Sequence, residues 1–97
     1  MSRRLVLRVQ AEVDIDEATS RYEAEQTGLG VRFIQDVNFL FERVEDNPFQ
    51  FPVVHGETRR AMARRFPYGV FFTVDDEEIL VLAVVHLHRH PDTWKKR

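Results

Sequence analysis

Three of the four histidines, one arginine and the only tryptophan lie within the stretch VVHLHRHPDTW, residues 84–94. Side chains alternate between the two faces of a strand, so His86 and His88 would project to one side and Arg89 to the other. His90 would join the two histidines if the strand continues that far. Imidazole can donate or accept a proton near neutral pH, and it can also bind metal ions. The stretch therefore has three alternative interpretations. It is a metal site, a catalytic or anion-binding cluster, or the packed end of a strand that has no chemical role.

A metal site is the weakest of these interpretations. Successive histidines on a flat strand are about 7 Å apart, which is too far for three of them to hold one ion. The chain has no cysteine that could complete a set of ligands. We therefore expect no metal ion and no cofactor.

The catalytic interpretation joins the histidines to the arginine-rich stretch RRAMARR, residues 59–65. Chemistry at a phosphate group needs a proton acceptor, a proton donor and cations that face the phosphate. Histidine can serve as the acid or the base, and guanidinium groups match phosphate oxygens. The residues predicted to supply the catalytic roles are His86, His88, Arg64, Arg65 and Tyr68. The residues predicted to bind an anion or a macromolecular target are Arg59, Arg60, Arg89 and Trp94.

A purely structural interpretation stands beside the catalytic one. His86 continues an apolar strand, where a hydrogen bond with the backbone could hold its ring in place. Trp94 could simply fold the end of the chain onto the sheet. Four arginines on one short strand cannot all be buried unpaired, so they would either share an anionic partner or bridge to acidic helices.

Two amphipathic helices are predicted before the arginine-rich stretch. Apolar residues recur at helical spacing over residues 11–22, and over a broader face across residues 33–44. The sequence TGLG at 27–30 supplies a turn between them, and the proline of DNP ends the second helix. Because this turn is short, the two helices should lie antiparallel.

Four strands are expected, at residues 5–9, 59–65, 68–74 and 79–87. The last strand is apolar on both faces, which is typical of a central strand, and the acidic sequence DDEE forms the turn before it. The predicted fold class is α+β, with one domain over residues 1–97 and the element order β-α-α-β-β-β. The sheet would be mainly antiparallel, with four strands, the first strand beside the central one and a helical hairpin packed on one face.

The net charge of −2 hides a strong asymmetry along the chain. Residues 11–57 contain eleven acidic residues against three arginines, whereas both flanking segments are basic. If the flanks share a face, that face could attract phosphate or an acidic protein. The absence of cysteine, of a long apolar run and of a start typical of a secretion signal favours a cytoplasmic protein that does not associate with membranes.

Four segments resemble the RelE/ParE toxin superfamily, in the branch of plasmid stabilisation proteins. They are AEVDIDEATSRYEAEQTGLGVRF, NPFQFP, RRAMARRFPYGVFFTV and ILVLAVVHLHRHPDTWKKR, which together span nearly all of the chain. The arginines before FPY, followed by the pattern H-x-x-R-x-P-x-x-W, are specific for the family and much less specific for one activity. The resemblance implies the toxin of a type II toxin–antitoxin module, with a cognate antitoxin as its partner.

The same resemblance implies two alternative targets. RelE-like toxins cut messenger RNA on the ribosome, whereas ParE-like toxins poison DNA gyrase and need not be nucleases. The histidines at the end of the last strand favour the nuclease. The absence of lysines from the sheet and the acidic net charge favour the gyrase poison. A degenerate binding module is the third hypothesis. Phe39 lies off the apolar stripe of its helix and is interpreted either as an exposed anchor for an antitoxin or as an additional core contact.

Overall fold

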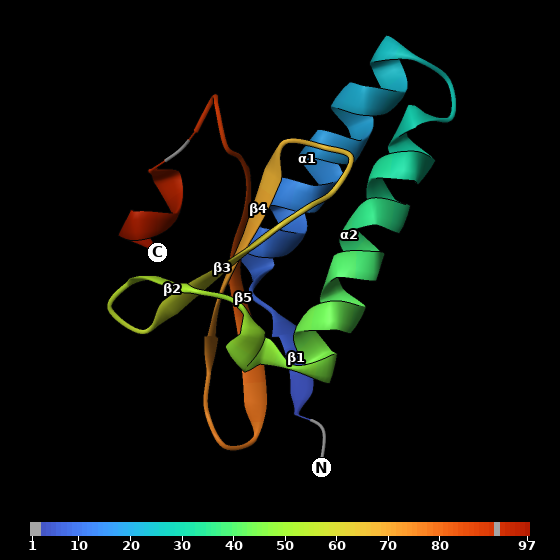
Figure 1. Cartoon of the computed structure of the whole chain (residues 1–97). Coiled ribbons are helices and arrows are strands. Elements are labelled where there is room, and N and C mark those ends of the chain that lie inside the picture. Colours follow the sequence, from blue (N-terminus) through green and yellow to red (C-terminus); the bar gives the residue numbers. More distant parts are fainter. Residues whose placement is uncertain (1–2, 91) are drawn as a thin grey trace.

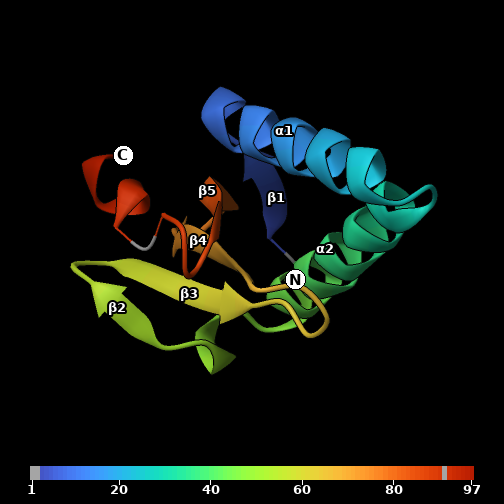
Figure 2. The same ribbon diagram turned by 90° about the horizontal axis from the view of Figure 1, so that it is seen from above.

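The structure of the protein is a computed structural model, and it describes residues 3–90 and 92–97. Its elements are β1 (Arg4–Leu7), α1 (Val9–Glu25), α2 (Leu29–Asp46), η1 (Pro48–Gln50), β2 (Val53–His55), β3 (Thr58–Met62), β4 (Tyr68–Val74), β5 (Glu78–His86) and η2 (Thr93–Lys96), where η marks a 3-10 helix. The strands form one sheet in the order β1-β5-β4-β3-β2. β1 is parallel to β5, and all other neighbours are antiparallel. Figures 1 and 2 show the hairpin of α1 and α2 covering one face of the sheet.

The predicted α+β class, the helical hairpin and the position of the first strand beside the central one are confirmed. The sheet has five strands rather than four, because the chain before β3 forms β2. A strand of three residues, Val53–His55, is too short to show an alternation in the sequence. The strand predicted over residues 59–65 ends at Met62, so Arg64 and Arg65 lie in the loop between β3 and β4.

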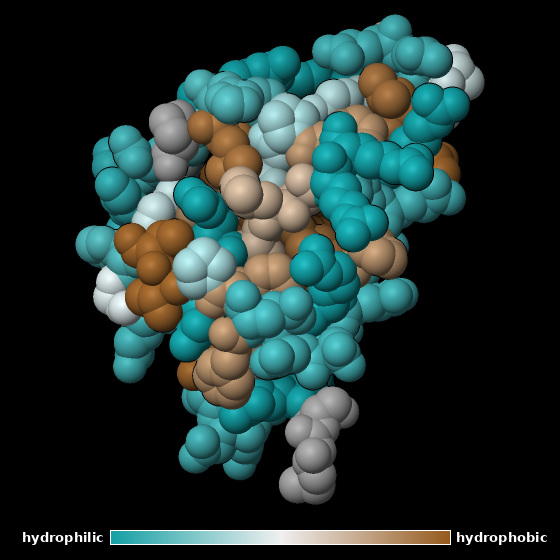
Figure 3. Space-filling model, viewed as in Figure 1, coloured by the Kyte–Doolittle hydropathy of each residue, from teal (hydrophilic) through white to brown (hydrophobic). Residues whose placement is uncertain are grey.

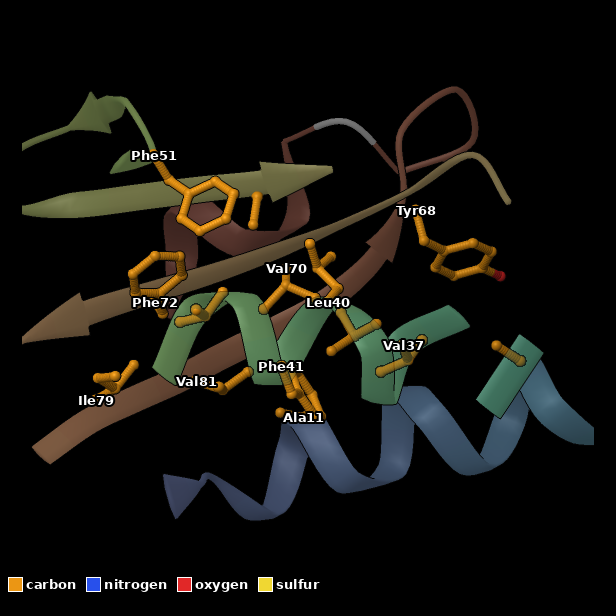
Figure 4. Packing of buried hydrophobic residues seen from close by; sticks show 14 of the residues in the cluster. Ala11, Val37, Leu40, Phe41, Phe51, Tyr68, Val70, Phe72, Ile79 and Val81 are labelled. Carbon is orange, nitrogen blue, oxygen red and sulfur yellow. The ribbon is translucent and has the colours of Figure 1, made fainter. Parts of the chain in front are cut away.

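The main core lies between the sheet and the helical hairpin. α2 contributes most of its apolar stripe, and the buried members are Phe33, Val37, Leu40, Phe41 and Val44. Val70 and Phe72 of β4 and Val81 of β5 meet this stripe from the sheet, as Figure 4 shows. Burial of these side chains fixes which face of the sheet the hairpin covers.

The two helices of the hairpin pack tightly at Gly30. A Cβ atom at this position would lie 2.9 Å from the carbonyl oxygen of Thr19 and 3.1 Å from the carboxylate of Glu23. The Glu23 carboxylate also accepts hydrogen bonds from the backbone N–H groups of Gly28 and Gly30, at 3.0 and 3.1 Å. Gly28 has a φ of 91°, which few other residues adopt. The two glycines therefore allow both the turn and the close packing.

A β-bulge in β5 decides which way the end of this strand faces. Phe71 pairs with Ala83 and Phe72 pairs with Val81, so Leu82 is an extra residue without a partner on β4. The bulge moves the following residues by one position, and Val84 therefore packs in the main core. Leu80 and Val84 thus do not share a face, although simple alternation along the strand would put both on the same side.

A smaller core covers the opposite face of the sheet. Phe71, Ala83 and Val85 pack there against Trp94 of η2, with Val54 and Leu87 at the margin. The end of the chain therefore covers part of the face that the helices leave open (Figure 2). Within residues 3–90 and 92–97, neither helix has the length and apolar character needed to cross a bilayer.

Candidate functional site

His86 is the last residue of β5, and its ring is part of the turn that follows. Its Nδ1 atom accepts hydrogen bonds from the backbone N–H groups of His88 and Arg89, both at 3.1 Å. The backbone N–H of His90 donates to the carbonyl of His86 at 3.0 Å. A nitrogen that accepts two hydrogen bonds carries no proton, so the neutral ring must hold its proton on Nε2.

Burial is the main physical reason that the neutral form of His86 is favoured. The side chain is 8% exposed, and loss of solvation lowers its pKa below the usual value for histidine. The nearby Arg89 guanidinium lowers this pKa further, as do His88, His90 and Arg21 to a smaller extent. His86 is therefore neutral at physiological pH.

The three histidines do not form the predicted line along a strand. β5 ends at His86, and His88, Arg89 and His90 lie exposed in the turn beyond it. The rings of His86 and His88 are 5.7 Å apart between centroids. Among the residues that the structure describes, no three histidine, aspartate or glutamate side chains come together as a group that could hold a metal ion.

His86 lines a pocket between α1 and the adjacent ends of β4 and β5. The pocket also contains Tyr68, Arg21, His90 and Glu17. The guanidinium of Arg21 donates to the Tyr68 hydroxyl at 3.3 Å, and the Tyr68 and His86 rings are 5.3 Å apart. Of the predicted catalytic residues, this pocket brings together only His86 and Tyr68.

The wall of the same pocket contains an ion pair between α1 and the end of the chain. The guanidinium of Arg97 donates to both carboxylate oxygens of Asp14, at 3.1 Å to Oδ1. Both side chains are largely buried. Asp14 also accepts a hydrogen bond from the backbone N–H of Val84 at 3.0 Å. Val84 follows Val81, the last residue of β5 that pairs with β1. Asp14 and Arg21 were not predicted from sequence. Their seven-residue spacing puts them on one helix face, but only the fold brings that face to His86.

Arg64 and Arg65 lie in a different pocket, between α2 and the β3–β4 loop. Asp36 of α2 accepts hydrogen bonds there from the backbone N–H groups of Arg65 and Phe66, at 2.9 and 3.1 Å. The guanidinium of Arg64 lies over the ring of Phe39, 5.6 Å from its centroid. Neither arginine lines the pocket of His86. The predicted catalytic residues are thus divided between two sites.

Arg59 and Arg60 lie on β3, away from both pockets. Arg59 donates to the carbonyl oxygen of Phe51 at 2.7 Å, and its guanidinium lies over the Phe49 ring at 5.1 Å. The Nε atom of Arg60 is buried and has no hydrogen-bond partner among the described residues. The ion pairs within residues 3–90 and 92–97 involve other cations, so the guanidinium groups of RRAMARR form no ion pair with the acidic helices there.

Trp94, which was predicted to bind a target, is buried against the sheet. Its ring stacks on Phe71 with 4.4 Å between centroids and an angle of 10° between the planes, and His55 meets its edge at 5.8 Å. The side chain is 7% exposed. Its main contacts are therefore those of a packed core residue, as in the structural interpretation.

Among the solved structures that align with this helical hairpin on a mainly antiparallel sheet, two come from toxin–antitoxin systems. A chain of the chromosomal ParDE system from P. aeruginosa aligns with a TM-score of 0.78 and 19% identity, covering 87% of this chain and 95% of that chain. A chain of the toxin–antitoxin complex RelBE2 from Mycobacterium tuberculosis aligns with a TM-score of 0.62 and 20% identity, covering 89% and 99%. At these identities the likeness establishes the fold.

The family follows from the sequence itself. The model of the family described as the ParE toxin of the type II toxin–antitoxin system, parDE, matches residues 5–91. The chain therefore belongs to the ParE toxin family. No curated protein matches it in sequence.

Proposed function

We propose that this ParE-type toxin inhibits growth by binding a protein target, DNA gyrase, and that it does so without cutting RNA. The observation that carries the proposal is the use of His86 Nδ1 as an acceptor for two backbone N–H groups. A general base needs an unprotonated atom within reach of the proton that it removes. In His86 that atom holds the turn, and Nε2 carries a proton.

The positions of the arginines support the same proposal. Cleavage of RNA needs cations around the scissile phosphate, next to the acid and the base. Arg64 and Arg65 instead border the pocket that contains Asp36 and Phe39. Membership of the ParE family also favours gyrase, because the family resemblance associates ParE-like toxins with this target. We expect a cognate antitoxin to neutralise the protein, and both proteins to act in the cytoplasm.

Cleavage of RNA in the pocket of His86 is the second candidate function. Arg21, Tyr68 and the Nε2–H group of His86 surround this pocket and could donate hydrogen bonds to a phosphate. Glu17 would then have to act as the base, since Asp14 is paired with Arg97. An acidic residue at the position of the phosphate opposes binding of RNA, so this candidate is the weaker one.

Controlled expression in bacteria separates the two functions. Growth, transcript integrity and the DNA-damage response would be followed in parallel after induction, with cells carrying an empty vector as the control. We expect growth arrest with double-strand breaks while transcripts remain intact. Rapid cleavage of transcripts without DNA breaks would refute the proposal and support the nuclease, and normal growth would support a degenerate binding module.

A further inference from the structure

We propose that the pocket between α2 and the β3–β4 loop binds an acidic protein segment that carries one large apolar side chain. The lining residues are Arg32, Gln35, Asp36, Phe39, Arg64 and Arg65, and we call this site the α2–loop pocket. We expect this segment to belong to the antitoxin, and this identification of the partner rests on the proposed function. Its chemistry follows from the pocket alone.

Within residues 3–90 and 92–97, no ion pair compensates the positive charge of the α2–loop pocket. Arg32, Arg64 and Arg65 are all exposed, and the described ion pairs join other residues. Asp36 is the one carboxylate of the pocket, and it is 8% exposed. Because its Oδ2 atom accepts from two backbone N–H groups, Asp36 fixes the loop, and the ion pairs among the described residues do not include it.

Phe39 gives the pocket an apolar surface. Phe39 is 47% exposed, whereas Leu40 and Val44 on the core-facing side of α2 are buried. The guanidinium of Arg64 lies over the ring in a cation–π contact. The exposed part of the ring is free to pack against an apolar side chain of a partner. Aromatic side chains surrounded by arginines are typical centres of protein interfaces.

The walls of the pocket are held in place before any partner binds. One wall is α2, which packs on the main core, and the other is the loop that Asp36 ties to this helix. In Figure 3 hydrophilic side chains surround hydrophobic ones near the centre of the face, and Figure 1 shows the β3–β4 loop beside α2. A partner therefore needs to order only its own segment on binding, which lowers the entropic cost.

An acidic peptide fits these features better than a nucleic acid does. Guanidinium groups bind carboxylates with two parallel hydrogen bonds, so a segment with several carboxylates could engage the three arginines. Binding of a nucleic acid backbone requires a long basic surface, whereas the chain has a net charge of −2 and an acidic α1. The apolar surface of Phe39 also has no role in contacts with phosphate.

The test uses the whole protein and a short fluorescein-labelled peptide of alternating glutamate and leucine, with binding followed by fluorescence anisotropy. Phe39→Ala and the double variant Arg32→Gln/Arg64→Gln should each weaken binding about tenfold. The matched controls are Phe49→Ala and Arg43→Gln, because Phe49 is 53% exposed and also lies under guanidinium groups. These controls should leave the affinity unchanged. Phe39→Leu should retain most of it and guards against a folding defect.

Several results would overturn the inference. One is that the peptide fails to bind, and another is that the pocket variants and the control variants lose the same amount of affinity. Binding that persists when serine replaces the leucines of the peptide would also contradict the inference. Tighter binding of a single-stranded oligouridylate, lost in the same variants, would identify the pocket as a nucleic-acid site instead. The outcome is independent of toxicity. If the peptide binds as expected but the protein fails to arrest growth, the proposed function is wrong and the binding chemistry of the pocket stands.

Discussion

At the scale of single residues, His86 shows how one ring can end a strand. The ring turns back on its own backbone and accepts from the N–H groups two and three positions further on. The two hydrogen bonds are partly buried, and these donors would otherwise lack a partner within the protein where β5 stops pairing. A fully buried donor without a partner costs about 1–3 kcal/mol. The imidazole thus replaces the hydrogen bonds that the next strand residues would have made.

Two amide substitutions distinguish a role in the turn from a role in catalysis. In His86→Asn the side-chain oxygen can occupy the place of Nδ1, whereas in His86→Gln the amide extends toward the place of Nε2. We expect the asparagine variant to lose less than about 1 kcal/mol of the free energy of unfolding and the glutamine variant about 2 kcal/mol, measured by urea denaturation. Equal stabilities would contradict the role in the turn. Loss of toxicity in a stable His86→Asn protein would favour the nuclease.

The same residue makes stability depend on pH. Burial lowers the pKa of His86 in the folded protein below the ordinary 6.5. Above pH 6.5 the ring is neutral in both the folded and the unfolded state, and its contribution to the free energy of unfolding is fully present. As the pH falls below this value, the unfolded chain takes up a proton first, and stability is lost until the pH passes the pKa of the folded state. Unfolding curves should show this loss, and it should be smaller in His86→Asn. An identical pH dependence in the two proteins would contradict it.

The sequence allowed both a catalytic and a structural role for His86, and both a target-binding and a structural role for Trp94, but it could not distinguish between them. For His86 and Trp94 the structural interpretation fits the contacts that are observed. The choice depends on the turn after β5 and on the stacking on Phe71, and both involve contacts that no local pattern in the sequence encodes. The catalytic and target-binding roles assigned to the arginines stay predictions.

At the scale of elements, η2 covers part of the sheet face that the helices leave open. Trp94→Ala would remove the ring that stacks on Phe71 and expose the smaller core. We expect a loss of about 3 kcal/mol in the free energy of unfolding, with most of it restored in Trp94→Phe. Circular dichroism during urea denaturation measures both variants. A Trp94→Ala protein as stable as the parent would mean that η2 does not pack on the sheet in solution.

The helical hairpin depends on a similar close contact. In Gly30→Ala the new methyl group would meet the carbonyl oxygen of Thr19 at 2.9 Å, so the helices would have to move apart. We expect a loss of about 2 kcal/mol in the free energy of unfolding, despite the better helix propensity of alanine. Ser20→Ala, at an exposed position of α1, is the control and should not destabilise the protein. If Gly30→Ala is instead the more stable protein, the hairpin is less tightly packed than described.

The helices and the long strands were predictable from sequence because each has a clear period. β2 and the bulge at Leu82 were not. A strand of three residues has no period, and a bulge looks like ordinary apolar sequence in a strand that is buried on both faces. The bulge mattered most, since it turns the end of β5, and His86 with it, toward α1.

At the scale of the whole molecule, the fold separates two clusters that the sequence suggested were one. The histidines and RRAMARR flank the same strand, β4, which made a shared site plausible. Asp36, however, draws the β3–β4 loop onto α2, while the bulge directs His86 toward α1. The result is one pocket with mixed charge and another that is basic and aromatic. This division is what favours binding over RNA cleavage.

The most direct test of the account is an assay of purified DNA gyrase with negatively supercoiled plasmid, in which linear DNA released from trapped cleavage complexes is measured. We predict that the protein increases linear DNA, and that His86→Asn does so to the same extent. A parallel reaction with messenger RNA should leave the transcript intact. Cleaved RNA together with unchanged plasmid DNA, and loss of that cleavage in His86→Asn, would contradict the account.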